Sequence, residues 1–146
     1  MKTEYQNPKD LSKPGSYTHV VSVAGAAKLV YVSGQVALGA DGSVIGKGDM
    51  RAQSEQVFRN VTNALKAAGA GWGDVIKLNG YMVDINPAAV AAYREVRSGF
   101  LKAGRFPAST LVGVTRLVQD ELLLEVEVVA ALEEKKAAGK AKKKKR

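Results

Sequence analysis

The sequence predicts a single α+β domain in which strands and two helices alternate along the chain. Segments rich in β-branched residues are separated by turn sequences such as Asp41-Gly42, and two other segments repeat apolar residues at the spacing of one helical face. A chain of 146 residues, 46% of them hydrophobic, is long enough for one domain with a core and too short for two.

The first elements along the chain are strands. Residues 19–35 are rich in β-branched side chains and are interrupted at Ala24-Gly25-Ala26, which predicts two strands joined by a tight turn. Asp41-Gly42 follows, and because both residues tolerate positive φ it predicts a hairpin turn between two short apolar stretches. We therefore expect the chain to begin as a β-meander.

Two helices are predicted in the middle of the chain. The first spans residues 51–68, in which apolar residues recur at helical spacing, and Gly69 is a suitable stop. The second begins at Asn86-Pro87, which is an N-cap followed by a proline at the first helical position. Its apolar stripe continues to about Ala103.

Three further strands are expected at residues 75–83, 109–117 and 122–132. In the last of these, alternation divides the side chains between two faces. One face carries Leu122, Leu124, Val126 and Val128, and the other carries Leu123, Glu125, Glu127 and Val129. The apolar face should lie under the helices. Two carboxylates among aliphatic neighbours suit a partly buried cleft or a subunit interface.

Composition narrows the class of protein. No apolar run approaches the ~20 residues that span a bilayer, and the first residues lack the apolar stretch of a secretion signal, so we expect a cytoplasmic protein without membrane contact. Cysteine is absent and His19 is the only histidine. These counts argue against disulfides, thiol nucleophiles and a His/Cys metal cluster, and we expect neither a metal site nor a cofactor.

The net charge of +8 is concentrated at the C-terminus. Residues 135–146 contain eight Lys and Arg and no acidic residue, which leaves 14 basic and 14 acidic residues in the rest of the chain. Such a block predicts a Lys-rich disordered tail over residues 134–146, after a domain at residues 1–133. Non-specific binding of nucleic acid by this tail is one hypothesis for a partner.

Glu125 and Glu127 are the acid/base candidates that the residues themselves provide. A carboxylate held partly dry beside aliphatic side chains can serve as a general base near neutral pH. Ion pairing with a basic neighbour across an interface explains the two residues equally well, so both interpretations stay open.

Four segments taken together resemble a known family. They are Gly15-Ser16-Tyr17, Tyr31-Val32-Ser33-Gly34-Gln35, Phe106-Pro107-Ala108-Ser109-Thr110 and Glu125-Val126-Glu127. In order and spacing, the sequence resembles the Rid family over about residues 15–132. This family is also called YjgF-like and is described as endoribonuclease L-PSP-like or as translation inhibitors. The resemblance implies a chorismate-mutase-like fold, with one mixed sheet, two helices on one face and a homotrimeric barrel.

The resemblance also implies small-molecule clefts between subunits and a role for each matching residue. Enzymes of the family hydrolyse reactive enamines and imines to a 2-keto acid and ammonia. Glu125 would position or activate the hydrolytic water. The substrate-binding residues would be Tyr17, Ser33, Gly34, Ser109 and Thr110.

The match departs from the family at one position. The deaminases have an arginine after Pro-Ala, which forms two parallel hydrogen bonds to the substrate carboxylate, and here Ser109 occupies that position. Arg105 precedes the strand and Arg116 is expected on its opposite face, so neither replaces the arginine. The sequence thus resembles a divergent group that lacks the substrate-binding arginine.

Three functions remain open at this point. The first is a hydrolase, or deaminase, of an imine or a related reactive metabolite. The second is a non-catalytic module that binds a metabolite in the same clefts. The third is an RNA-binding or ribonuclease-like protein that uses the basic tail.

Overall fold

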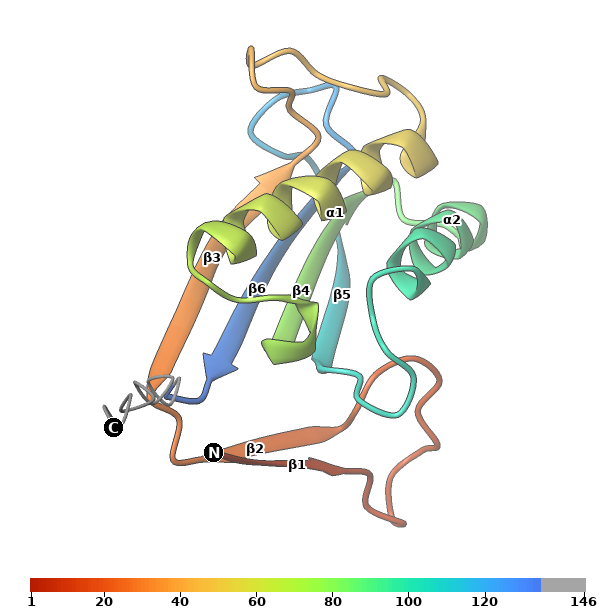
Figure 1. The fold of residues 1–146 in the computed structure, drawn as a ribbon. Helices are drawn as coiled ribbons and strands as arrows, with labels where there is room; N and C mark the ends of the chain where they lie inside the picture. Colours follow the sequence, from red (N-terminus) through yellow and green to blue (C-terminus); the bar gives the residue numbers. More distant parts are fainter. Residues whose placement is uncertain (135–146) are drawn as a thin grey trace, which may run out of the picture.

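In the computed structural model, which describes residues 1–134, two helices pack on one face of a four-stranded sheet and a two-stranded hairpin lies beyond one end of that sheet (Figure 1). The expected α+β class and the mixed sheet are confirmed. The Lys-rich tail predicted from residue 134 lies outside the described residues from residue 135 onward.

The four-stranded sheet has the order β3-β6-β4-β5. Its strands are β3 (Lys28–Val36), β4 (Val75–Val83), β5 (Ala108–Val114) and β6 (Leu124–Leu132). β6 runs antiparallel to both of its neighbours, whereas β4 and β5 are parallel and are connected through the second helix. The last strand in sequence therefore lies inside the sheet.

Each helix begins at an N-cap side chain, of which only Asn86 was predicted from the sequence. α1 (Met50–Ala67) is capped by Asp49, whose carboxylate accepts the backbone N–H of Ala52 at 3.0 Å. α2 (Pro87–Ser98) is capped by Asn86. Over residues 1–134, neither helix is long and apolar enough to cross a membrane.

The predicted end of α2 at about Ala103 is wrong. The helix ends at Ser98 with Gly99 as its C-cap, and the backbone N–H of Phe100 donates to the carbonyl of Arg97 at 3.1 Å in a tighter turn. Phe100 turns back into the core, where its ring lies 5.1 Å from that of Phe58 on α1. The helix end was predicted too late because apolar residues at helical spacing continue in the sequence beyond Ser98.

The expected β-meander is also wrong. β1 (Lys2–Gln6) pairs with β2 (Val20–Ala24), and β3 pairs with β6 rather than with β2. Gly25, with φ of +69°, turns the chain between the two sheets. When β3 pairs with β6, α1 covers the apolar residues of β3. If β3 paired with β2 in the separate hairpin, no helix would cover them.

Smaller differences concern turns and strand ends. Asp41-Gly42 does form a turn, but only one antiparallel bridge, Leu38 to Val44, flanks it. β5 ends at Val114 rather than at residue 117, which leaves Arg116 outside the strand, where it pairs with Asp120 at 2.8 Å.

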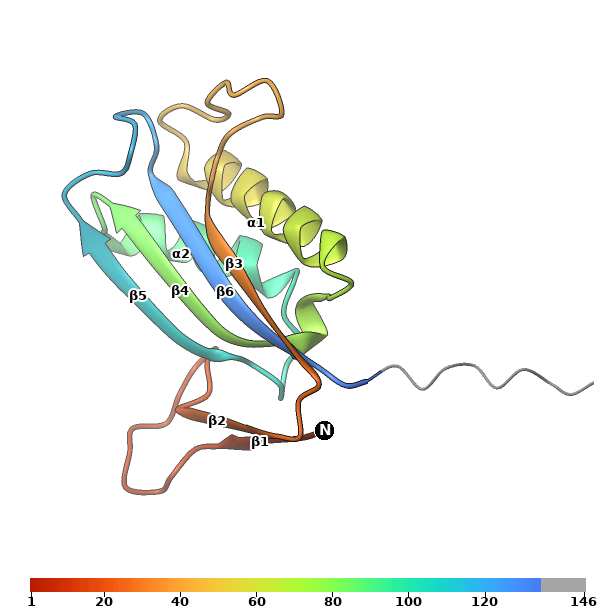
Figure 2. The same cartoon turned by 90° about the vertical axis from the view of Figure 1, so that its left-hand side faces the viewer.

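The core lies between the helices and one face of the sheet. The buried residues of α1 that fill it are Val57, Phe58, Val61 and Leu65, and those of β6 are Leu124, Val126, Val128 and Ala130. The predicted apolar face of the last strand is therefore confirmed. The opposite face of the sheet, called the open face below, is covered by no element of residues 1–134 (Figure 2).

Candidate functional site

A row of polar side chains crosses the open face of the sheet. On β4, Lys77, Asn79 and Tyr81 alternate with residues that point into the core. In the β4–β6 register, Asn79 lies opposite Glu127 and Tyr81 lies opposite Glu125. Both carboxylates of β6 are therefore placed beside polar partners on the same face.

Glu127 is held as an anion by two neutral donors. The side-chain amide of Asn79 and the hydroxyl of Tyr81 each donate to the same carboxylate oxygen, Oε1, at 2.8 Å. These hydrogen bonds, with the nearby charge of Lys77, lower the pKa of Glu127, and donating to the carboxylate raises the pKa of Tyr81. A carboxylate stabilised in its charged form is a poor proton acceptor, so Glu127 suits electrostatic support rather than general-base catalysis.

Glu125 has a different environment. Its carboxylate lies against the backbone of Gly34: a Cβ built at Gly34 would stand 2.7 Å from Cδ of Glu125 and would overlap Oε1. The pairing of β3 with β6 shifts register between Val32 and Gln35, and this irregularity brings Gly34 under the carboxylate. A side chain at residue 34 would therefore displace Glu125.

The lone pairs of Glu125 remain free. Unlike Glu127, Glu125 accepts no hydrogen bond within residues 1–134, and its side chain is half-buried. A carboxylate with unoccupied acceptor sites in a partly dry position can take a proton from a bound water. This arrangement makes Glu125 the stronger base candidate of the two.

A buried glutamine on α1 fixes the start of β6. The side-chain amide of Gln53 donates to the carbonyl of Glu121 at 2.7 Å, and its Oε1 accepts the N–H of Leu123 at 2.7 Å. Gln53 is fully buried, so these bonds are shielded from water. Sequence reasoning missed this residue, although Gln53 lies four residues before Val57 and thus on the buried side of the helix.

Ser33 shares a hollow on the open face with the Glu127 cluster. The hollow measures about 380 Å³, and its polar lining consists of Tyr31, Ser33, Lys77, Asn79 and Glu127. Three of these residues, Tyr31 on β3 and Lys77 and Asn79 on β4, were not predicted as site residues. The signal for those on β4 was the period-two polar pattern at residues 77, 79 and 81, which was obscured because Asn79-Gly80 resembles a turn.

Ser109 and Thr110 lie on opposite faces of β5. Ser109 is in register with Leu78, which is fully buried under the helices, whereas Thr110 is in register with Asn79 on the open face. The hydroxyl of Thr110 accepts a hydrogen bond from the Lys77 ammonium at 3.1 Å. Of this pair, only Thr110 joins the polar row within one chain.

The loop that carries Tyr17 is tied to the start of β5. The backbone N–H of Thr18 donates to the Pro107 carbonyl at 3.2 Å, and its hydroxyl donates to the Phe106 carbonyl at 2.6 Å. Tyr17 therefore lies beside the segment that contains Ser109. Its ring meets that of His19 edge-on at 5.2 Å between centroids.

The predicted site residues consequently form two groups within one chain. Ser33, Gly34 and Glu125 lie together on β3 and β6, and Tyr17 lies near Ser109. Glu125 is paired with Tyr81, and Tyr81 is paired with Val112 on the next strand. Val112 lies three residues after Ser109 on β5. The separation is roughly 10 Å along the strands and roughly 10 Å across them, with the side chains on opposite faces. A single chain does not bring the two groups together.

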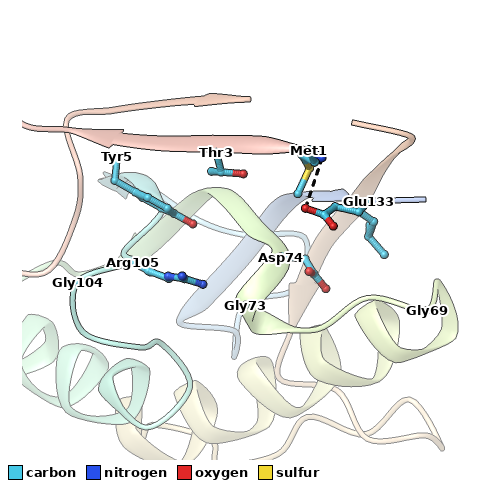
Figure 3. A pocket seen from close by; sticks show the side chains of 10 residues that line it. Met1, Thr3, Tyr5, Gly69, Gly73, Asp74, Gly104, Arg105 and Glu133 are labelled. Atoms are coloured by element: carbon cyan, nitrogen blue, oxygen red, sulfur yellow. Dashed lines mark ion pairs between the residues drawn. The ribbon is translucent and has the colours of Figure 1, made fainter. Parts of the chain in front are cut away.

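Another hollow contains none of the predicted site residues. It measures about 590 Å³ and lies between the N-terminal hairpin and the body, with Tyr5 and Arg105 pointing into it (Figure 3). The N-terminal amine pairs with Glu133 at 3.4 Å on one side. Arg105 precedes β5, as predicted, and it lines this hollow. In the described part of the chain, no three His, Cys, Asp or Glu side chains gather as metal ligands.

Comparison with known proteins gives consistent matches over most of the chain. A family model described as Endoribonuclease L-PSP matches residues 9–132. A RutC family protein of Pyrococcus abyssi is 33% identical over 116 residues, which cover 80% of this chain and 86% of that protein. The 2-iminobutanoate/2-iminopropanoate deaminase of Dermatophagoides farinae is 29% identical over 119 residues, covering 82% of this chain and 88% of that protein.

The fold has solved counterparts as well. The crystal structure of YyfB from Yersinia pestis, a Rid family protein of unknown function, matches with a TM-score of 0.83 and 33% identity. The match covers 90% of this chain and 100% of that one. Sequence and fold therefore agree on the same group of proteins.

Proposed function

The chain belongs to the Rid family, whose model is described as Endoribonuclease L-PSP, and on this basis we propose that it hydrolyses a reactive imine or enamine in clefts between the subunits of a homotrimer. The relative from Dermatophagoides farinae is named as an imine deaminase, which supports the reaction class. The observation that carries the proposal is the Glu125 carboxylate, which accepts no hydrogen bond from residues 1–134 and lies against the backbone of Gly34.

Assembly would complete the site that one chain leaves divided. A cyclic trimer places one surface of each subunit against a different surface of the next, so Tyr17 and Ser109 of one subunit can face Glu125 of its neighbour. The open face also presents apolar side chains to solvent, with Tyr31 75% exposed and Leu29 50% exposed. Burying such side chains between subunits favours association.

The chemistry follows from the placement of Glu125. The carbon of a protonated imine is electrophilic, and Glu125 takes one proton from a water as the water oxygen bonds to that carbon. Glu125 then returns this proton to the nitrogen of the tetrahedral product. As the C–N bond breaks, the hydroxyl of that product gives its own proton to Glu125, and ammonia and a carbonyl compound leave. Glu127, held as an anion beside this position, stabilises the positive charge of the iminium.

Substrate recognition would differ from that of the arginine-bearing deaminases. Ser109 offers one hydroxyl where they offer two parallel charge-assisted hydrogen bonds, each worth about 1.5–3 kcal/mol. Imines without a carboxylate lose nothing by this change. We therefore propose a neutral imine, or one whose carboxylate is bound elsewhere, as the substrate class.

The direct test compares hydrolysis of carboxylate-free and carboxylate-bearing imines, generated by an oxidase and followed by semicarbazide trapping. Glu125→Gln should lower the rate by about 10²–10⁴-fold, because it removes the general base while keeping the size of the side chain. Glu121→Gln is the matched control, since in the described part of the chain the Glu121 side chain pairs only with Lys47, on the surface.

Full activity in Glu125→Gln would show that Glu125 is not the base. A wild-type protein that binds imine analogues but hydrolyses none of the panel would instead identify a non-catalytic metabolite-binding module.

A further inference from the structure

Arg97 on α2 holds the loop that carries Tyr17. Its Nη1 donates to the carbonyl and to the hydroxyl of Ser16, at 2.7 and 3.1 Å. Ser16 directly precedes Tyr17, and Thr18, which follows it, is hydrogen-bonded to the segment that leads into β5. The backbone of Tyr17 is therefore fixed on both sides, by α2 on one side and by the start of β5 on the other.

The guanidinium of Arg97 is buried without a compensating anion. Only 4% of the residue is exposed. Within residues 1–134 no carboxylate pairs with it, and Glu95 on the same helix pairs with Arg51 instead. Nε and Nη2 are shielded from solvent and make no hydrogen bond in this part of the chain. Burial accordingly lowers the pKa of Arg97.

Fold stability alone does not explain an arginine at this position. A buried charge with unpaired donors destabilises the folded chain, and an apolar side chain of similar volume in its place is often neutral or stabilising. Apolar neighbours are available, because Leu101, Ala103 and Phe106 line the same small hollow as Arg97. What an apolar side chain could not supply is the pair of hydrogen bonds to Ser16.

We propose that Arg97 is a positioning residue, which orders the loop at Tyr17 before the substrate binds. A binding group on an ordered loop loses less conformational entropy on binding, so its affinity for the substrate is higher. Arg97 does not itself touch the substrate, because its free donors are sealed from solvent. The inference rests on the proposed function, in which Tyr17 of one subunit faces Glu125 of its neighbour.

Arg97→Met tests the inference, because methionine keeps an unbranched side chain and removes every donor. We expect the urea midpoint of the variant to stay at or above that of wild type. KM for the best imine of the panel should rise about tenfold with kcat nearly unchanged, because Tyr17 binds the substrate while Glu125 transfers the proton. An arginine with a purely structural role would give the opposite result, in which stability and activity fall together.

Two control variants and a double-mutant cycle isolate the effect. Arg94→Met is the matched control, because Arg94 lies on the same helix and lines the same hollow but is exposed, and it should leave KM unchanged. Arg97→Lys keeps a charged donor for Ser16 and should restore part of the affinity. In a Tyr17→Ala background, Arg97→Met should change KM by less than about twofold, because Arg97 acts through Tyr17.

Hydrogen exchange reports on the loop without any catalysis. The backbone N–H of Thr18 donates to the Pro107 carbonyl at 3.2 Å. Its exchange should be faster in Arg97→Met and unchanged in Arg94→Met. If the wild type hydrolyses no imine, the proposed function fails, and the dissociation constants of unreactive oximes, measured by calorimetry, replace KM in the same comparison.

Three results would overturn the inference. A lower urea midpoint in Arg97→Met would mean that the arginine stabilises the fold, for example because an acidic side chain of a neighbouring subunit pairs with it. Additive effects in the double-mutant cycle would mean that Arg97 does not act through Tyr17. An unchanged KM in Arg97→Met, or no binding of any oxime, would show that the order of this loop does not matter for a ligand.

Discussion

The carboxylate of Glu125 occupies the space into which a side chain at Gly34 would project. A Cβ at Gly34 would stand 2.7 Å from Cδ and 2.9 Å from Cγ of Glu125. Two segments that are far apart in the sequence therefore form one structural unit. Because Gly34 on β3 has no side chain, the carboxylate of Glu125 on β6 can lie against its backbone.

Gly34→Ala should reduce imine hydrolysis while the protein stays folded. The added methyl group meets the mobile end of Glu125 rather than backbone, so the carboxylate moves and the fold tolerates the change. A displacement of about 1 Å at a catalytic group can cost up to about 10²-fold in rate. Steady-state kinetics on the best imine of the panel measures the loss.

The control for Gly34→Ala is Gly73→Ala, because a Cβ at Gly73 meets no atom within 4 Å. Equal rates for Gly34→Ala and wild type would mean that the position of Glu125 does not matter for the reaction.

Tyr31→Glu should weaken the trimer. Tyr31 is 75% exposed on the open face, which assembly would bury, and a charge there would have to be desolvated without a partner. Light scattering after size exclusion should give about three times the 15.5 kDa of one chain for wild type and a lower mass for the variant.

The matched control for Tyr31→Glu is Val118→Glu, because Val118 is 76% exposed but lies in the loop after β5. A monomeric mass for the wild type at micromolar concentration would contradict both the trimer and the clefts that depend on it.

Ser109→Arg should raise activity on carboxylate-bearing imines and leave neutral imines unchanged. The new guanidinium would supply the two parallel hydrogen bonds that the serine lacks, with a gain of up to about tenfold to hundredfold. The same trapping assay reports both substrate classes. Strong wild-type activity on 2-imino acids would refute the importance of this position, and equal gains on both classes would point to a change in cleft shape.

Tyr81→Phe should destabilise the protein most at neutral pH. The variant removes one of the two hydrogen bonds that lower the pKa of Glu127. A carboxyl whose folded-state pKa is lowered contributes stability above its unfolded pKa, and this contribution disappears as pH falls through the folded value. The loss relative to wild type should be about 0.5–1.5 kcal/mol near neutral pH and should shrink as pH falls below the ordinary value of 4.5.

Urea unfolding at a series of pH values measures this difference. Tyr31→Phe is the control, because it removes a hydroxyl from the same face without touching Glu127. A stability difference that stays constant down to acid pH would show that Tyr81 acts through packing rather than through the carboxylate.

The elements that local patterns determine were predictable. The alternation in β6 identified which side chains face the helices, because a strand exposes its two faces at a fixed period of two. The caps at Asp49 and Asn86 act within one helical turn. Asn86 was recognised with Pro87, whereas Asp49 was missed and the helix start was placed one residue late.

The features that depend on distant contacts were not predictable. Whether β3 pairs with β2 or with β6 depends on which partner lets α1 cover its apolar residues, and a single strand does not carry that information. Gln53 looks like an ordinary polar residue of an amphipathic helix in the sequence. Its importance comes from the backbone groups of Glu121 and Leu123 that it bonds after folding, which only the packed chain shows.

The place of β6 in the sheet has a consequence for synthesis. β6 is the final strand of the described chain, yet it lies between β3 and β4, and neither of these strands pairs with the other. The growing polypeptide therefore cannot close its sheet until residues up to about Leu132 have been translated. Until then, β3 and the β4–β5 pair have unpaired strand edges. Premature termination of translation at this stage would release an aggregation-prone fragment rather than a smaller folded protein.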